Sequence, residues 1–201
     1  EKTLAYRSIM DSYFYLGQFE DSEFIAKRIL QSENLPDEER IFAQKRLAAS
    51  IFNHAKLFED QGQFMDAANE FRRVFVESPE DTVYAEAGLF NSGRNYDKIK
   101  EWEKALDTYL LLADQYPESK YAISSLVNAA EDNKELKRFS DAAGIYERIY
   151  TRQINNPEEA ETALYNAAYY YQEGEDWNNA IRLNNKYIAT YPDNPLSTDF
   201  Y

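Results

Sequence analysis

Four asparagines recur along the chain at a nearly constant spacing. The intervals between them are 38, 37 and 38 residues, and the four are Asn53, Asn91, Asn128 and Asn166. A carboxamide offers both a hydrogen-bond donor and an acceptor, so a row of them can hold the backbone of a peptide without reading its sequence. Asparagines at such positions also cap or bridge neighbouring helices. Peptide contact and helix bridging are therefore two open interpretations of this row.

The sequence contains few residues that could support catalysis. There is no cysteine, and His54 is the single histidine, so thiol chemistry and histidine-pair metal motifs are excluded. A glycine-rich phosphate loop and a nucleophile elbow are also missing from the sequence. The acidic runs at residues 37–39 and 158–159 each follow a proline and are explained as helix starts, where carboxylates are favourable to the helix dipole. We therefore predict no catalytic residue, no cofactor and no metal, and a partly packed structural role for His54.

The strongly acidic balance limits the class of partner. The 36 acidic and 22 basic residues give a formal net charge of -14. Nucleic-acid binding depends largely on basic residues that release counterions, so no nucleic-acid partner is expected. An anionic membrane surface is disfavoured for the same reason, and no apolar run approaches the ~18 residues of a membrane span. A neutral or basic polypeptide is the expected partner, and no small-molecule substrate is expected.

Glycines and prolines divide the chain into consecutive helices. Gly17, Gly62 and Gly174 are expected in turns, since glycine tolerates the positive φ of a tight helix end. Pro36 and Pro157 are expected to open helices. The expected helices span residues 3–16, 19–31, 36–60 and 64–79, two segments within 86–117, then 120–138, 139–152, 157–173 and 177–190, with the start of a truncated next helix in 195–201.

Two sets of residues repeat with one period. In the second helix of each pair an aromatic residue precedes an alanine by three positions, at Phe64 and Ala67, Trp102 and Ala105, Phe139 and Ala142, and Trp177 and Ala180. In the first helix a large apolar residue precedes a small one by four positions, at Ile51 and Ala55, Leu89 and Gly93, Leu126 and Ala130, and Leu164 and Ala168. Two registers that share a period predict a solenoid, in which each helix pair buries its faces against its neighbours.

At these residues the chain resembles the tetratricopeptide repeat family. The middle unit matches the family pattern at Leu89, Gly93, Tyr96, Trp102, Ala105, Tyr109 and Pro117. The resemblance implies an all-α fold, a right-handed α-solenoid of about ten helices in antiparallel pairs. We expect a single array over residues 1–201, with units at 36–80, 81–118, 119–156 and 157–194, a divergent or capping pair at 1–35, and the truncated helix at 195–201.

Some positions depart from the family pattern. Met10 stands in a column of small residues, and Ser22 replaces the repeated alanine. Asn133 and Asn184 stand where aromatic residues are expected. The period of 37–38 residues exceeds the usual ~34 and resembles that of bacterial envelope proteins, such as outer-membrane assembly lipoproteins and Tol–Pal-associated periplasmic repeat proteins. That likeness implies a periplasmic or outer-membrane-associated location.

The resemblance also implies where a partner would bind. In this family the first helix of each pair lines a concave groove, while the second packs outside. The asparagine row is then expected toward or beside the groove, with apolar pockets and two basic groups next to it. Packing in the core or between repeats is the competing interpretation for the aromatic members. The groove-facing set includes Phe52, Lys56, Phe90, Arg94, Val127, Tyr165 and Tyr169 together with the four asparagines.

Two functional hypotheses follow from this reading. The first is a non-catalytic scaffold that binds a peptide or protein segment in the groove, within a larger multiprotein complex. The second is a structural repeat domain that associates with itself as a homo-oligomer, or an interaction domain of a larger enzyme or sensor. Because the chain begins at Glu1 without a methionine and ends soon after a helix-start signal, we expect it to be a fragment of a longer protein.

Overall fold

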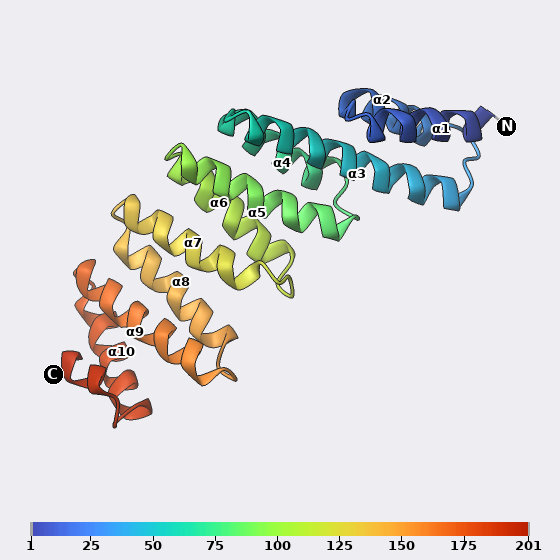
Figure 1. Ribbon diagram of the computed structural model, residues 1–201. Coiled ribbons are helices and arrows are strands. Elements are labelled where there is room, and N and C mark those ends of the chain that lie inside the picture. Colours follow the sequence, from blue (N-terminus) through green and yellow to red (C-terminus); the bar gives the residue numbers. More distant parts are fainter. Residues whose placement is uncertain (1, 201) are drawn as a thin grey trace. The chain divides into compact units, whose positions relative to one another are not determined.

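The chain folds into helices joined by short turns. The computed structural model describes residues 2–200, and within them it contains ten α-helices, one 3-10 helix and no strand (Figure 1). The chain divides into two compact units, the first ending at Glu101 and the second beginning at Trp102. In the described residues no helix has both the length and the apolar character needed to cross a membrane. The expected all-helical fold is confirmed.

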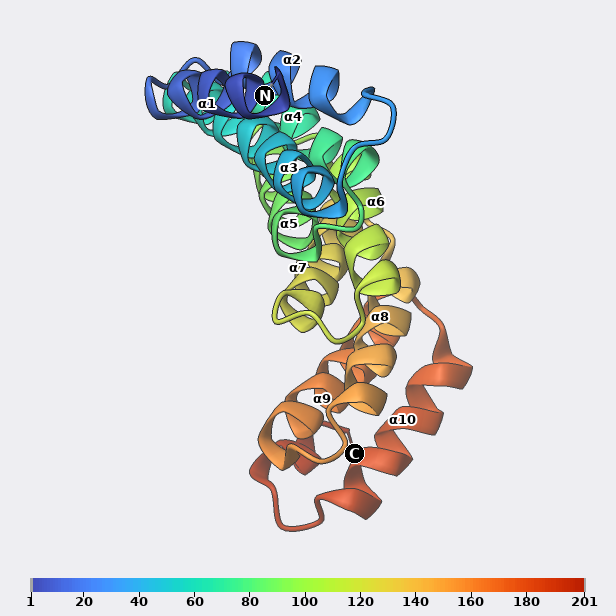
Figure 2. The ribbon, with the colours of Figure 1, turned by 90° about the vertical axis from the view of Figure 1, so that its right-hand side faces the viewer.

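Consecutive helices pack on one another within each unit. The first unit contains α1 (Lys2–Tyr15), α2 (Phe19–Leu30), α3 (Asp37–Asp60), α4 (Phe64–Glu77) and α5 (Thr82–Lys98). The second contains α6 (Trp102–Gln115), α7 (Ala122–Glu135), α8 (Phe139–Arg152), α9 (Pro157–Glu173), α10 (Trp177–Thr190) and η1 (Pro195–Phe200). The expected helix at 195–201 is thus a 3-10 helix over its described residues, and η1 packs against α10 (Figure 2).

The repeated residues form the core of both units. The repeated alanines of the second helices are buried, with exposed fractions of 0 to 2% at Ala67, Ala105, Ala142 and Ala180. The large apolar residues of the first helices are fully buried at Ile51, Leu89, Leu126 and Leu164. Small residues therefore lie where helices approach closely, and large ones fill the space between them. The unit boundaries within a single array, and the handedness of the superhelix, stay predictions.

The turns differ in part from expectation. Gly17 and Gly62 adopt φ of 76° and 74°, the left-handed conformation that favours glycine. Gly174 lies in the expected turn but does not carry the positive φ, which falls on Glu175 at 56°. Gly174 is required for another reason: a Cβ there would lie 2.6 Å from Ser140 Oγ and 3.0 Å from Ser140 N on α8.

The first helix pair has its own packing. Met10, which stands in a column of small residues, is fully buried. Ser22 replaces the repeated alanine and is also fully buried, where its hydroxyl accepts a 3.0 Å hydrogen bond from Ser50 Oγ on α3. The serine that replaces the repeated alanine is thus matched by a serine on the neighbouring helix. Pro36, expected as the first helical residue, is instead the N-cap of α3.

Candidate functional site

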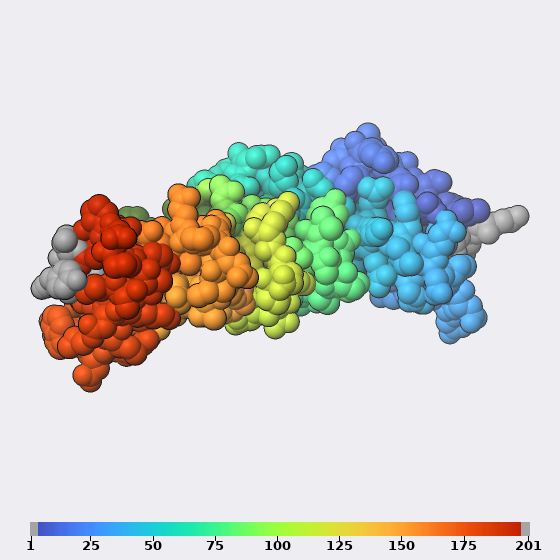
Figure 3. Space-filling view, turned by 90° about the horizontal axis from the view of Figure 1, so that it is seen from below, coloured from blue at the N-terminus to red at the C-terminus, as the bar shows by residue number. Residues whose placement is uncertain are grey.

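In each unit the first helices of neighbouring pairs flank a pocket. In the first unit, α3 and α5 border a pocket of about 370 Å³, which Phe42, Lys45 and Tyr84 help to line. In the second unit, α7 and α9 border a pocket of about 460 Å³, with α8 between them. Figure 3 shows one face of the molecule on which α3 (light blue) and α5 (green) lie next to each other in the first unit. The pockets therefore lie on the helices that the sequence assigns to the groove.

On α3, two of the predicted residues make contacts within the protein. The ring of Phe52 packs 5.1 Å from that of Phe71 and 5.4 Å from that of Tyr84, so it fills space between α3, α4 and α5. Asn53 is half-buried, and its Nδ2 donates a 2.7 Å hydrogen bond to the carbonyl of Ala49 in its own helix. Lys56 is exposed.

On α5, Phe90 and Asn91 are half-buried, and Arg94 is exposed. The charge of Arg94 acts on Glu59 of α3, which also accepts hydrogen bonds from Lys98 at 2.6 Å and from Asn95 at 3.2 Å. Burial tends to raise the pKa of the Glu59 carboxyl, but these donors and charges outweigh it and lower that pKa. A carboxylate of the protein itself therefore already lies near Arg94.

In the second unit, Asn128 and Asn166 are half-buried on α7 and α9, and Asn166 lines the pocket. The half-buried Tyr165 packs 5.9 Å from the ring of Tyr187. Tyr169 is 41% exposed and lies 5.2 Å from the ring of Tyr170. Of the eleven residues expected to face the groove, Val127 and Asn166 line this pocket and the other nine do not.

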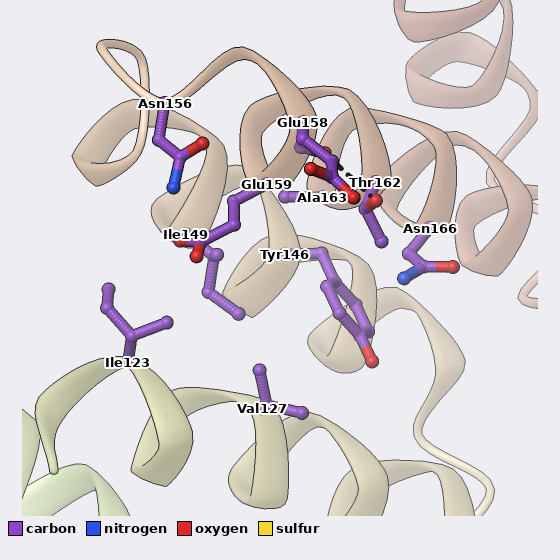
Figure 4. Close-up of a pocket in the computed structure, with 10 residues that line it drawn as sticks. All are labelled: Ile123, Val127, Tyr146, Ile149, Asn156, Glu158, Glu159, Thr162, Ala163 and Asn166. Carbon is purple, nitrogen blue, oxygen red and sulfur yellow. Dashed lines mark hydrogen bonds between the residues drawn. The ribbon is translucent and has the colours of Figure 1, made fainter.

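The pocket of the second unit has an apolar floor and a polar rim (Figure 4). Tyr146 and Ile149 of α8 form the floor, and both are more than nine-tenths buried. Ile123 and Val127 of α7 form one wall. The opposite side belongs to α9 and the turn before it, and contributes Asn156, Glu158, Glu159, Thr162, Ala163 and Asn166.

The charges around this pocket are unevenly distributed. Glu158 and Glu159 are exposed, and within residues 2–200 neither carboxylate makes a hydrogen bond or ion pair. The pocket lining contains no lysine, arginine or histidine. At the floor, the Tyr146 hydroxyl donates a 3.3 Å hydrogen bond to Glu131 Oε1. Burial and the charge of Glu131 raise the pKa of Tyr146 well above its ordinary value, so the phenol stays neutral.

Sequence reasoning missed most of this lining. Tyr146 and Ile149 belong to the apolar stripe of their helix, and periodicity alone assigns them to the core. Glu158 and Glu159 were explained as a helix start, which the structure also supports, because Pro157 is the first residue of α9. Counting back one and two turns of α9 from Asn166 leads to Thr162 and Glu159. That count along the groove-facing side is the signal that could have found them.

His54 is not part of either pocket. Its Nδ1 lies 3.0 Å from Glu70 Oε1, its Nε2 lies 3.7 Å from Glu20 Oε1, and its ring centroid is 4.7 Å from that of Phe58. Glu70 is bonded in addition to Arg73, at 2.7 and 2.8 Å. These contacts join α2, α3 and α4, so the histidine packs as a structural residue.

Comparison with known proteins agrees with this architecture. Residues 87–119 and 162–194 match the tetratricopeptide repeat. A comparison with curated proteins finds no match. Among solved structures, the chain is similar to a protein of Podosopora anserina described as a kinesin light chain with nearly identical TPR-like repeats, at 14% identity, 94% coverage of both chains and a TM-score of 0.51.

Two further structures have a similar fold. BtubC (BKLC) from P. vanneervenii is 14% identical, with 90% of this chain and 76% of that chain covered and a TM-score of 0.51. MamA AMB-1 is 12% identical, with 98% and 96% covered and a TM-score of 0.50. Stacked helix pairs of this kind generally serve as interaction scaffolds with extended binding surfaces. The matched segments and the shared fold support tetratricopeptide repeats in an all-helical solenoid.

Proposed function

We propose that the chain is a non-catalytic scaffold that binds a polypeptide segment on the face formed by its first helices, as part of a larger multiprotein complex. The observation that carries this proposal is the position of the pockets. In each unit a hollow lies between the first helices of neighbouring pairs, α3 with α5 and α7 with α9. A segment lying in such a hollow gains apolar contact there, while polar groups of the helices hold its backbone.

Three asparagines are available to bind the backbone of such a segment. Asn91, Asn128 and Asn166 are half-buried, and within residues 2–200 their side-chain amides make no hydrogen bond. Asn53 differs, because its amide donates to the backbone of its own helix. A partner backbone that bonds to these amides satisfies donors and acceptors that solvent otherwise occupies. We therefore assign peptide contact to these three residues and a helix-bonding role to Asn53.

A pair of double variants tests the role of the amides. Peptides are first selected from a random 12-residue phage-displayed library against the intact chain, and their affinity is measured by fluorescence anisotropy. Asn91→Ala with Asn128→Ala should weaken a selected peptide by about 1–3 kcal/mol, the cost of hydrogen bonds lost to a buried backbone. The matched control is Asn178→Ala with Asn185→Ala, two exposed asparagines of α10. Equal affinity in both double variants would remove the amides from the site.

Self-association is the second candidate function. Trp177 and Ile181 lie one turn apart on α10, and each is 59% exposed. Adjacent exposed apolar side chains are typical of contact surfaces between proteins. Size-exclusion chromatography with light scattering tests this function, because a dimer that dissociates on Trp177→Ser with Ile181→Ser would support it. A monomer at high concentration would reject it.

The cellular compartment belongs to the same proposal. A location in the bacterial envelope is supported by the 37–38-residue period, which exceeds the usual ~34 residues. Fractionation of the source cells, with a specific antibody against residues 1–201, checks it. Recovery in the cytosolic fraction would reject the envelope assignment without affecting the binding proposal.

A further inference from the structure

We infer that the pocket between α7, α8 and α9 takes an apolar side chain of a bound peptide that has a lysine or arginine next to it. This inference rests on the proposed scaffold function and names the chemistry of its partner. Two properties of the pocket carry it: an apolar hollow of sufficient size, and free negative charge on one rim only.

The hollow is suited to aliphatic or aromatic side chains. Its volume of about 460 Å³ lies within the roughly 300–1,000 Å³ of ligand pockets. The Tyr146 ring and Ile149 close it from below, and Ile123 and Val127 border it on α7. Tyr146 is held in place from both sides, because its hydroxyl bonds to Glu131 and its ring stacks on Tyr170 at 5.6 Å and 8°. The floor is therefore ordered before a ligand arrives.

The rim on α9 supplies the charge. The carboxylates of Glu158 and Glu159 make no hydrogen bond or ion pair within residues 2–200, and no basic side chain lines the pocket to neutralise them. A peptide cation next to the inserted side chain meets both carboxylates, while an acidic residue in that place is repelled. The amides of Asn156 and Asn166 lie on the same side and can bond to the peptide backbone.

The pocket of the first unit provides an internal contrast. Its lining contains Lys45 and Arg46 together with Asp81. Arg46 is paired with Asp11 at 2.7 Å, which leaves Lys45 exposed beside the hollow. A basic peptide is therefore expected to select the pocket of the second unit over this one.

The competing explanation is that the two carboxylates only stabilise the start of α9. The chain contains a control for it, because Asp37 and Glu38 follow Pro36 in the first turn of α3, as Glu158 and Glu159 follow Pro157 in the first turn of α9. Those two residues are exposed and line neither of the pockets described above. Reversing both charges at either helix start changes the net charge equally and is unfavourable to the helix dipole in both cases. Only the pair on α9 should alter peptide binding.

The test uses the same random 12-residue library on the intact chain, with competing selections on variants. Glu158→Lys with Glu159→Lys is paired with Asp37→Lys with Glu38→Lys. Val127→Arg, which places a long cation over the hollow, is paired with Ser124→Arg on an exposed position of the same helix outside the lining. Circular dichroism confirms that each variant is folded before its binding is measured.

We expect selected peptides to share an apolar residue next to lysine or arginine. Their affinity should fall about tenfold in the Glu158 and Glu159 double variant at low salt, less at high salt, and stay unchanged in the control. Val127→Arg should abolish binding that Ser124→Arg preserves.

The two failures are distinguishable. Peptides that bind wild type and all four variants alike, or that are enriched in acidic residues, would overturn the inference and leave the scaffold function intact. No enrichment over an uncoated surface would overturn both.

Discussion

Two glycines inside helices should respond oppositely to the same added methyl group. Gly88 in α5 and Gly144 in α8 both have helical neighbours on either side. A Cβ at Gly88 would lie 2.7 Å from the Phe71 carbonyl oxygen and 3.2 Å from Val74 Cβ on α4. A Cβ at Gly144 would meet only the Tyr171 hydroxyl, at 3.9 Å, which is ordinary contact. Comparing alanine substitutions at the two glycines therefore distinguishes the effect of close helix packing on stability from the effect of helix propensity.

The magnitudes follow from these distances. Replacing glycine by alanine in a helix interior gains about 1 kcal/mol of helix propensity. At Gly144 that gain is unopposed, so Gly144→Ala should stabilise the protein by up to about 1 kcal/mol. At Gly88 the contact is with backbone, which cannot move unless α4 and α5 separate, and overpacking costs about 1–3 kcal/mol. Gly88→Ala should therefore be less stable than Gly144→Ala by about 1–3 kcal/mol.

Urea unfolding followed by circular dichroism at 222 nm measures both variants against wild type. The comparison between the two variants is the informative quantity, because the propensity gain is common to both and cancels. If Gly88→Ala is as stable as Gly144→Ala, the close approach of α4 and α5 is wrong. If Gly144→Ala is destabilised by more than about 1 kcal/mol, the space for a Cβ at Gly144 is smaller than described.

Two further predictions concern the second unit. Asn184 stands in an aromatic column, and its Oδ1 is buried without a hydrogen-bond partner in the part of the chain that the structure describes. Asn184→Leu should therefore stabilise the fold by about 1–3 kcal/mol in urea unfolding. No gain in stability would contradict this. Burial tends to raise the pKa of the Glu147 carboxyl. Hydrogen bonds from Arg182 and Tyr171 outweigh that effect and lower the pKa below its ordinary value. The ionised Glu147 carboxylate therefore stabilises the folded protein above about pH 4.3, the unfolded-state pKa, and this contribution is lost as the pH falls through the folded-state pKa. The difference in unfolding free energy between wild type and Glu147→Gln should shrink from pH 7 to pH 3. A constant difference across that range would contradict the assignment.

The periodic part of the fold could be predicted from the sequence because it depends on local spacing. The repeated positions at Leu89 and Ala105 predict that both residues belong to the core, and both are fully buried. Gly174 shows where local reasoning ends. Its requirement comes from Ser140, 34 residues earlier in the chain, and not from its own φ.

The candidate site could be predicted less well. A helical stripe indicates that Tyr146 is buried, and it is, with 6% exposed. The Tyr146 ring also forms the floor of a pocket, because α7 and α9 lie far enough apart to leave one edge of it open. The spacing of residues within α8 carries no information about that separation. In the same way, the spacing that identifies Asn53 cannot tell that its amide bonds to Ala49. The binding roles of the predicted residues stay predictions.

The buried contact between Ser22 and Ser50 limits how this chain could be lengthened by copying repeats. The hydroxyl of Ser50 has a polar partner because Ser22 faces it, and the two are fully buried. A copy of residues 157–194 inserted between α2 and α3 would set Ala163 against Ser22 and Ala180 against Ser50, and would leave two hydroxyls without partners. Copies introduced after α4 leave the hydrogen bond between Ser22 and Ser50 intact and avoid that cost. Gene duplication, or an engineer adding modules, is therefore expected to extend the chain after α4 and to leave the contact between α2 and α3 unchanged.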